Sequence, residues 1–338
     1  MSETLSIAEL NSLLREGKPF AAFRLPGQKD FHFAGEEGFV VKVVEYCQKF
    51  QTASNAVDFI PRKGHSSEEQ FITTPKNEYL AGVNEVVRFH KSLGFGKTVL
   101  ARQIAGVTHI ETVLDRVSNY FATQPNAFCL VWFTPDGLLR VMATPELLLK
   151  IDSQNRLTTM ALAGTRHVGL HTEWDEKNLE EHKIVAEYIR ERLADLGYCN
   201  PRETKYTRQS GNIEHICTEF VAEVKGSESA ERLEEAGRIL DALSPTPAVC
   251  GYPVESARGN IRKYEKVKRD FYSGYTVVIM PSGEIYAFVN LRFVCIDIKS
   301  GKFAITSGSG VTALSDAEVE WEETALKAQP LLTLLSIN

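Results

Sequence analysis

The sequence has no long apolar run. Its longest apolar segments, Ala127 to Phe133 and Tyr275 to Met280, are far shorter than the roughly 20 residues that a membrane-spanning helix needs. The first ten residues carry two acidic and no basic side chains, so they lack the positive segment that opens a secretory signal. These absences predict a cytoplasmic protein with no membrane partner.

Cysteine is also scarce, and no Cys-x-x-Cys pair occurs. The chain has six cysteines, several of them inside apolar runs: Cys47, Cys129, Cys199, Cys217, Cys250 and Cys295. Scattered cysteines in a chain of this length are typical of buried, reduced thiols. The sequence therefore predicts neither a disulfide framework nor a zinc site.

An excess of basic residues is missing as well. The 338 residues include 44 acidic and 38 basic side chains, for a net charge of −6, and no long Lys/Arg run. Nucleic-acid binding begins with neutralisation of phosphates, so a nucleic-acid partner is not expected. Hydrophobic residues make up 43% of the chain, which is enough for a folded core and excludes general disorder. We expect a small-molecule substrate.

What the sequence does contain is an alternation of helical and strand patterns. Apolar residues recur at helical spacing in five segments: 74–94, 110–121, 174–197, 233–243 and a last one from about residue 316. Short β-branched or apolar runs predict strands at 97–104, 127–133, 138–144, 147–152, 156–164, 275–280, 284–289, 292–298 and 302–308. Turn residues between neighbouring runs favour an α+β fold with mostly antiparallel sheets flanked by helices.

Thr74 and Pro75 are expected to supply the N-cap and the first residue of the first of these helices, and Gly94 its end. The polar stretch 62–70 is the best candidate for an exposed loop. We divide the chain into an N-terminal segment, 1–90, packed on the same unit, and a catalytic region, 91–338.

Two glycine motifs do not point to nucleotides. The segment from Gly94 to Thr98 ends like a P-loop, but Lys91 stands where the first glycine is required, and a helix precedes it. The segment Gly308-Ser309-Gly310 begins like a dinucleotide fingerprint but has Ala313 in place of its third glycine. We expect a strand-to-helix turn with a close backbone approach at the second motif.

Carboxylates at helical spacing are a stronger signal. Glu181 precedes His182 on one predicted helix, while Glu320 and Glu323 lie three residues apart on the last helix, with Lys327 one turn further on. Residues at this spacing project from one face. The pattern alone is typical of a solvated acidic face with an ion pair.

Eight ordered segments change that interpretation. They are KTVLAR at 97–102, TPELLLK at 144–150, ALAGTR at 161–166, EEHKIV at 180–185, SPTPAVCGYP at 244–253, RDFYSGY at 269–275, LRF at 291–293 and SGSGVTALSDAEVEWEETALKA at 307–328. From Lys97 to Lys327 the chain thus closely resembles the chorismate-utilising enzymes, a family that includes isochorismate, salicylate, anthranilate and aminodeoxychorismate synthases. Residues 1 to about 90 carry no motif of this kind.

The resemblance implies a Mg²⁺ site. Glu181 and Glu323 would approach the metal, with Glu320 close by through water, in keeping with the preference of Mg²⁺ for oxygen ligands and retained waters. Salicylate synthases have an acidic residue three places before the glutamate that matches Glu181, and this chain has Asn178 there. The metal shell is therefore expected to differ.

The resemblance also implies the substrate site and the catalytic pair. Residues that match substrate-lining positions are Gly164, Thr165, His215, Ala248, Tyr272, Arg292, Gly310 and Lys327. Lys97 matches the general base and Glu146 the general acid. A lysine can act as a base near neutral pH only where burial or a neighbouring cation lowers its pKa, and the acid must keep its proton.

Three positions discriminate within the family. Ala163 stands where enzymes that attach nitrogen at C4 have a lysine; CGYP at 250–253 replaces a GAPK-type sequence of anthranilate synthases; and Ala248 replaces the threonine of salicylate synthases. The resemblance is thus best to isochorismate synthases of menaquinone or siderophore biosynthesis, expected as a monomer with no obligatory glutaminase subunit. Three alternatives stay open: a salicylate synthase, a non-catalytic chorismate-binding relative and a P-loop protein.

Overall fold

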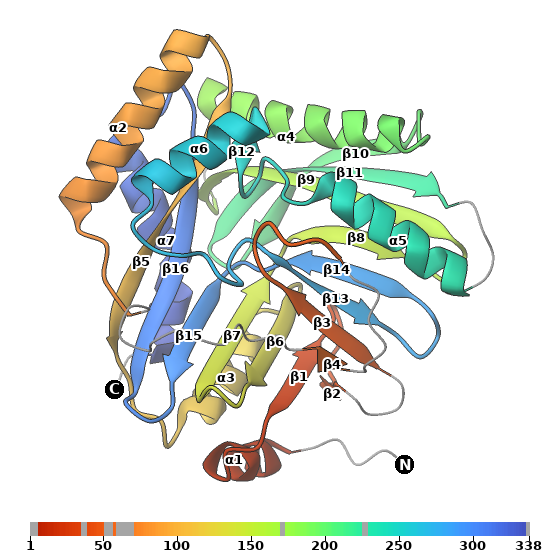
Figure 1. Ribbon diagram of the computed structural model, residues 1–338, viewed down its shortest axis with the longest axis vertical. Helices are drawn as coiled ribbons and strands as arrows, with labels where there is room; N and C mark the ends of the chain where they lie inside the picture. The colour runs from red at the N-terminus through yellow and green to blue at the C-terminus, as the bar shows by residue number, and fades with distance from the viewer. Residues whose placement is uncertain are drawn as a thin grey trace.

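In the computed structural model, two eight-stranded sheets form the centre of the part of the chain that is described: residues 6–34, 39–50, 57–58, 71–169, 173–224 and 229–335. The predicted loop at 62–70 lies outside these residues. Within these residues, all strand pairs but one are antiparallel. The α+β fold with mostly antiparallel sheets is confirmed (Figure 1).

The first sheet joins segments from both ends of the chain. Its order is β12 (Gly251–Tyr252), β5 (Lys97–Val107), β16 (Lys302–Val311), β15 (Phe293–Asp297), β7 (Leu138–Thr144), β6 (Phe128–Phe133), β1 (Phe20–Arg24) and β2 (His32–Phe33). β5 and β16 pair along ten residues of β16. This long pairing sets the register between the segment KTVLAR at 97–102 and the segment that begins at Ser307.

The second sheet has the order β10 (Arg202–Ser210), β11 (Ile213–Glu223), β9 (Arg156–His167), β8 (Leu147–Ile151), β14 (Ile285–Val289), β13 (Tyr275–Ile279), β3 (Val40–Val44) and β4 (Val57–Asp58). β3 and β4 form the parallel pair. The two sheets face each other across an aromatic core, in which the rings of Phe128 and Phe288 stack at 4.3 Å. Strands such as β1, β6 and β7 are buried along their whole length, because one face meets the other sheet and the other face meets helices.

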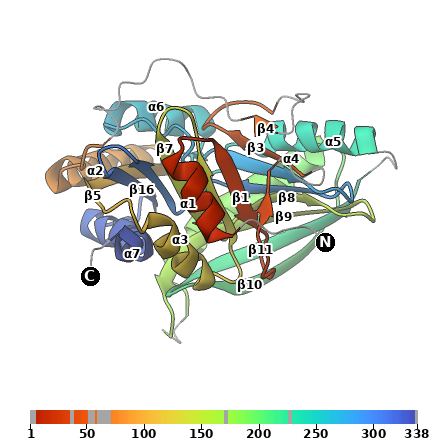
Figure 2. The same cartoon turned by 90° about the horizontal axis from the view of Figure 1, so that it is seen from below.

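Helices cover the outer faces. α1 (Ile7–Arg15), α3 (Val113–Ala122) and α7 (Ala317–Leu335) pack on the first sheet, and α4 (Glu176–Asp195) and α5 (Ser229–Leu243) on the second. Figure 2 shows α1 and α3 together on the near face, with α7 beside α3. α2 (Lys76–Leu93) and α6 (Val254–Tyr264) lie along β5. The result is a four-layer arrangement, helix–sheet–sheet–helix.

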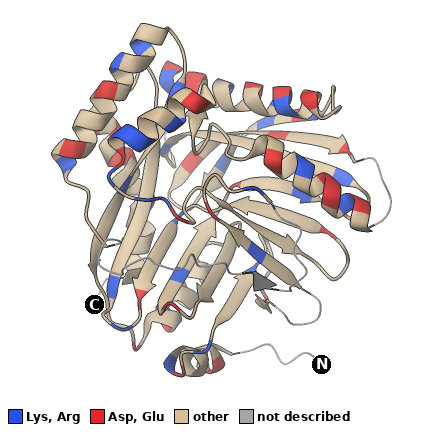
Figure 3. Ribbon diagram, viewed as in Figure 1, with Lys and Arg blue, Asp and Glu red and all other residues tan. Residues whose placement is uncertain are grey.

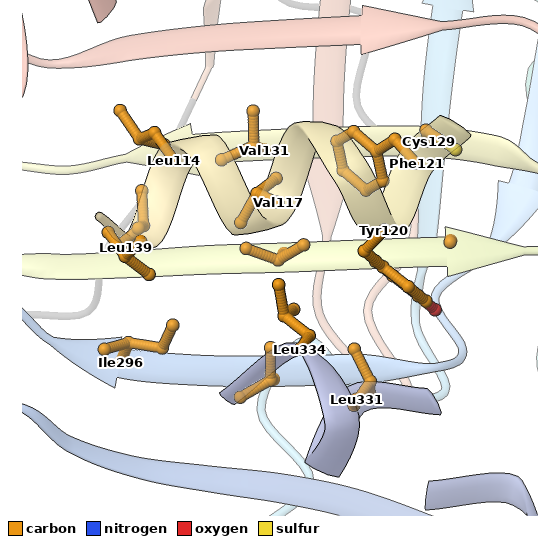
Figure 4. Packing of buried hydrophobic residues seen from close by; sticks show 14 of the residues in the cluster. Leu114, Val117, Tyr120, Phe121, Cys129, Val131, Leu139, Ile296, Leu331 and Leu334 are labelled. Atoms are coloured by element: carbon orange, nitrogen blue, oxygen red, sulfur yellow. The ribbon is translucent and has the colours of Figure 1, made fainter. Parts of the chain in front are cut away.

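The apolar stripe predicted for residues 110–121 packs as expected. Leu114, Val117 and Phe121 of α3 contact the first sheet, and Leu331 and Leu334 of α7 close the same cluster (Figure 4). Each such buried side chain contributes about 1.5–3 kcal/mol relative to exposure. Packing of this cluster fixes α7, which carries three of the charged residues singled out in the sequence.

Three expectations were wrong in detail. Thr74 does not cap α2, since its hydroxyl accepts a hydrogen bond from the Gln103 amide at 3.0 Å and Pro75 takes the N-cap position. Gly308 to Gly310 lie inside β16 and form no strand-to-helix turn, although the close backbone approach is present. Cys47 and Cys199 are exposed, because they lie in connections outside the core.

Charge is distributed over the helices, where Lys/Arg and Asp/Glu alternate, and most strand residues are uncharged (Figure 3). Among the described helices, none combines the length and the apolar character of a bilayer-spanning segment.

Candidate active site

A cavity between the sheets gathers most of the residues singled out in the sequence. It encloses about 700 Å³ of space not filled by atoms, part of it open to solvent. Its lining includes ten of them: Glu146, Gly164, Thr165, Glu181, His215, Ala248, Tyr272, Arg292, Gly310 and Lys327. The other three, Lys97, Glu320 and Glu323, lie behind the wall in contact with lining residues or their partners.

Lys97 begins β5 and is fully buried. Its ammonium lies 2.9 Å from Oε1 of Glu181. A Cβ atom added at Gly310 would lie 2.6 Å from Cε of Lys97 and 2.2 Å from Oε1 of Glu181. Only glycine at position 310 therefore lets the lysine–glutamate pair reach the cavity wall, which is the close approach expected at this motif.

Glu146 lies in an environment that favours the protonated form of its carboxyl group. It follows Pro145 just before β8 and is 3% exposed. Burial raises its pKa to about 8, against the opposing effect of the positive charges of Lys97 and Lys327. At neutral pH the side chain is thus mainly protonated and able to donate, which is the property expected of a general acid.

Glu181, Glu320 and Glu323 are brought together where α4 meets α7. The cation at their centre is Lys177, whose Nζ lies 3.1 Å from Glu181, 3.0 Å from Glu320 and 3.8 Å from Glu323. Sequence reasoning missed Lys177, although its position one turn before Glu181 was a signal. Against the effect of burial, these carboxylates raise the pKa of Lys177 well above its usual value.

His215 holds substrate-lining elements together on β11. Its Nδ1 donates to the Gly164 carbonyl at 2.9 Å, so its Nε2 is free to accept from Arg292 at 3.4 Å. Burial, and then the positive charges of Arg292 and Lys327, lower the pKa of His215 to about 3. The ring is therefore neutral, and it orients Arg292.

Asn178, which stands where salicylate synthases have an acidic residue, makes hydrogen bonds within the protein. Its Oδ1 accepts from the Thr165 amide at 2.9 Å, and its amide group donates to Asp175 at 2.8 Å. The side chain ties the start of α4 to the turn of β9 at Gly164, where φ is +78°. Because position 178 is Asn and not an acidic residue, the site has one negative charge fewer beside the carboxylates.

Arg292 and Lys327 supply positive charge to the cavity. Lys327 Nζ donates to the Gly308 carbonyl at 3.1 Å and pairs with Glu323 at 2.6 Å. No carboxylate of the described residues lies within ion-pair distance of the Arg292 guanidinium. A partly buried arginine without an acidic partner favours an anionic ligand.

The carboxylates suit a hard cation. Both Glu320 oxygens are buried and make no hydrogen bond within the described part of the chain, although one contacts Lys177. Burial, together with the negative charges of Glu323 and Glu181, raises the pKa of Glu320 against the opposing effect of Lys177. No three acidic, His or Cys side chains among the described residues are already arranged as a metal cage. The donor set nonetheless fits Mg²⁺ by its chemistry.

Residues 36–336 match the family described as chorismate binding enzyme. The chain is 30% identical to the chloroplastic isochorismate synthase of Catharanthus roseus over 256 residues, which are 72% of this chain and 42% of that protein. It is 28% identical to the isochorismate synthase MenF of Bacillus subtilis over 282 residues, 77% of this chain and 56% of that protein. The chain thus spans about half the length of these relatives.

Another relative carries a different activity in its name. Anthranilate synthase component 1 of Cereibacter sphaeroides is 30% identical over 222 residues, 62% of this chain and 42% of that protein. Among solved structures, DhbC of Bacillus anthracis has a TM-score of 0.68 at 20% identity and covers 98% of this chain and 89% of that chain. The match in fold and the family match over most of the sequence agree, and the chain belongs to the chorismate-binding enzymes.

Proposed function

We propose that this protein is an isochorismate synthase, which converts chorismate to isochorismate by addition of water at C2 and loss of the C4 hydroxyl. The observation that carries the proposal is the pair of buried groups at one cavity. Lys97 lies directly behind the wall, where the absent side chain of Gly310 leaves room for it, and Glu146, whose pKa burial raises to about 8, lines the cavity. Two of the relatives above bear the same activity in their names.

Lys97 is the proposed base, which takes a proton from the attacking water. Lys97 is fully buried and its ammonium pairs with Glu181, so Glu181 must engage another cation before Lys97 can accept a proton. Glu146 is the proposed acid, which gives its proton to the departing hydroxyl. Arg292, oriented by His215, and Lys327 would hold substrate carboxylates.

Mg²⁺ is the proposed cofactor, and Glu181 and Glu323 would hold it, with Glu320 close by. When bound, it supplies positive charge for a carboxylate of the substrate. The chain's own residues orient the ring and exclude water from the rest of the cavity. We further propose that the protein works in the cytoplasm, as a monomer and without a glutaminase subunit.

Ala163 and Ala248 support water as the nucleophile. Ala163 is buried on β9 and offers no amine for covalent attack, which disfavours an aminodeoxychorismate synthase. Ala248 lines the cavity and adds no hydroxyl to it. The second candidate is a salicylate synthase, which would go on to eliminate pyruvate from isochorismate, and the small side chain at position 248 argues against it.

The test is product identification. Purified protein is incubated with chorismate and Mg²⁺, the products are separated by chromatography, and pyruvate is measured with lactate dehydrogenase. We expect isochorismate in equilibrium with chorismate, little pyruvate, and no turnover after exhaustive EDTA treatment. Stoichiometric pyruvate release at neutral pH would favour the salicylate synthase, and full turnover in EDTA would remove Mg²⁺ from the proposal.

A further inference from the structure

Lys177 is placed unlike an ordinary helical ion-pair partner. An i,i+4 lysine typically meets one carboxylate on its own helix, as Lys183 does on α4, where its Nζ lies 3.8 Å from Glu187 and both side chains are exposed. Lys177 instead contacts Glu181 on α4 and also Glu320 and Glu323 on α7, and its side chain is only 17% exposed. Lys177 thus links α4 to α7 at the proposed metal site.

Lys177 is also the main compensation for the most buried carboxylate. The Glu320 side chain is 1% exposed, and of the described lysines and arginines only Lys177 lies within ion-pair distance of it. Glu181 and Glu323 each have a second lysine partner, Lys97 and Lys327 respectively. Without Lys177 or another cation, three carboxylates would share two lysines in a region of low dielectric, where like charges repel strongly.

A metal ion cannot take the place between these carboxylates while the Lys177 ammonium fills it. Two cations within about 4 Å of each other repel, and the three carboxylates cannot direct the same oxygens to both. Lysine has a long flexible stem, and Lys177 is one of the less buried members of the cluster. Its departure is therefore the simplest way to open the site.

We propose that Lys177 is an internal counter-cation, which holds the carboxylate cluster together in the metal-free protein and is displaced when Mg²⁺ binds. The inference rests on the proposed function only through the assignment of these carboxylates to Mg²⁺. As a consequence, Mg²⁺ competes with the Lys177 ammonium for the carboxylates, and this competition sets the observed Mg²⁺ affinity. The same residue that stabilises the metal-free cluster weakens the binding of the metal.

The experiment is calorimetric titration of MgCl₂ into metal-free protein in the absence of substrate, with wild type, K177M and K183M. K183M is the matched control, because it removes a lysine from the same helix at an exposed position. We expect K177M to bind Mg²⁺ about tenfold or more tightly than wild type, since a competing charge is gone. K183M should bind as wild type does.

Thermal unfolding gives a second readout. Metal-free K177M should unfold at a lower temperature than metal-free wild type, and Mg²⁺ should raise its melting temperature by more than it raises that of wild type. A K177M protein that folds only in Mg²⁺ would support the proposal as well. One that stays unfolded at any Mg²⁺ concentration would contradict it, because the metal must be able to replace the lysine.

Wild-type or weaker Mg²⁺ affinity in folded K177M would overturn the inference, as would the absence of Mg²⁺ binding by both proteins. These readouts need no turnover, so they are separate from the product assay. A wild-type protein that makes no isochorismate while K177M binds Mg²⁺ more tightly would refute the proposed reaction and leave the role of Lys177 standing. Isochorismate formation by the wild-type protein, together with an unchanged Mg²⁺ affinity in K177M, would support the proposed reaction and refute the role of Lys177.

Discussion

Glu146 and Glu181 line one cavity, yet their surroundings drive them to opposite protonation states. Both are buried, and burial raises the pKa of each. At Glu181 the charges of Lys177 and Lys97 outweigh burial and hold the pKa well below its usual range. At Glu146 they do not, and the pKa is raised to about 8. Such separation is how two carboxyl groups of one site take different roles.

The Glu146→Gln variant lacks the proposed proton donor. Because a glutamine side chain cannot give a proton to the leaving hydroxyl, we expect kcat to fall by about 10²–10⁴. In wild type, kcat/KM should fall as pH rises through about 8, where Glu146 loses its proton. Steady-state kinetics from pH 6 to 9.5 measure both. Wild-type turnover in the variant would remove Glu146 from the mechanism.

The same variant makes a stability prediction. The folded-state pKa of Glu146, about 8, exceeds the ordinary value of 4.5. Between these values the folded state binds more protons than the unfolded state, so this group's contribution to stability decreases as pH rises from about 4.5 to 8. The Glu146→Gln variant lacks this dependence, because an amide does not titrate. The difference in melting temperature, variant minus wild type, should therefore be more positive at pH 8 than at pH 5. An equal difference at both pH values would contradict the raised pKa of Glu146.

Ala248→Thr tests the choice of nucleophile. Threonine would add bulk and a hydroxyl to the cavity wall, and misplacing a reacting group by about 1 Å can cost about a hundredfold in rate. We expect slower isochorismate formation with little change in chorismate binding, because Arg292 and Lys327 are untouched. Kinetics together with equilibrium binding would separate the two effects. Equal losses in both would show that position 248 merely shapes the cavity.

At the residue scale, most of the site could be predicted from sequence because its members fall in recognisable motifs. For Lys177, the spacing predicts only the ion pair with Glu181 one turn on, and its contacts with Glu320 and Glu323 depend on how α4 and α7 meet. The partner of Asn178 was equally hidden, because Thr165 reaches it only through the fold of β9. The assignments of catalytic and metal-binding roles remain predictions.

At the scale of elements, β16 and α7 together carry four of the candidate site residues. β16 carries Gly310, and the helix that follows carries Glu320, Glu323 and Lys327. Lys327 returns to the strand through the Gly308 carbonyl. The pairing of β16 with β5 then sets Gly310 opposite Val99, two residues after Lys97. Strand register therefore determines how Lys97 and the carboxylates meet.

Gly310→Ala tests this close approach. The added methyl group would overlap Glu181 and Lys97, so their ion pair must shift. Since these are flexible side-chain ends, we expect a folded protein with a loss of kcat/KM on the order of a hundredfold. Gly259→Ala on α6 is the control, because a Cβ there has no neighbour within 4 Å. It should keep activity and gain a little stability. Equal activity of both variants would contradict the geometry.

The long helices α2, α3, α4, α5 and α7 were predicted, whereas the helices α1 and α6 and the strands β10 and β11 were not. β10 was missed because its side chains are mostly exposed and show no apolar alternation, and it forms the edge of its sheet against β11. β1 and β3 were visible only as short apolar stretches. Their place in the sheets depends on pairing with β6 and β13, more than 100 residues away. Local pattern carries no information on such pairing.

At the scale of the whole molecule, the four layers place the cavity between two sheets that the helices shield from outside. Residues from β5, β9, β11, β16 and α4 meet there. The fold class could be predicted because strand and helix patterns and the family motifs agree. The division of the chain near residue 90 stays a prediction, and so do the oligomeric state and the pathway.

The central claim is that water activated by Lys97 adds at C2 while the C4 hydroxyl leaves. The most direct measurement is mass spectrometry of isochorismate formed in H₂¹⁸O with Mg²⁺. We predict one ¹⁸O per molecule, located at C2, with release of one unlabelled water, and no label in chorismate incubated with Lys97→Ala. Isochorismate without ¹⁸O would show that the hydroxyl migrates within the substrate, and the role of Lys97 as the base that activates water would then be wrong.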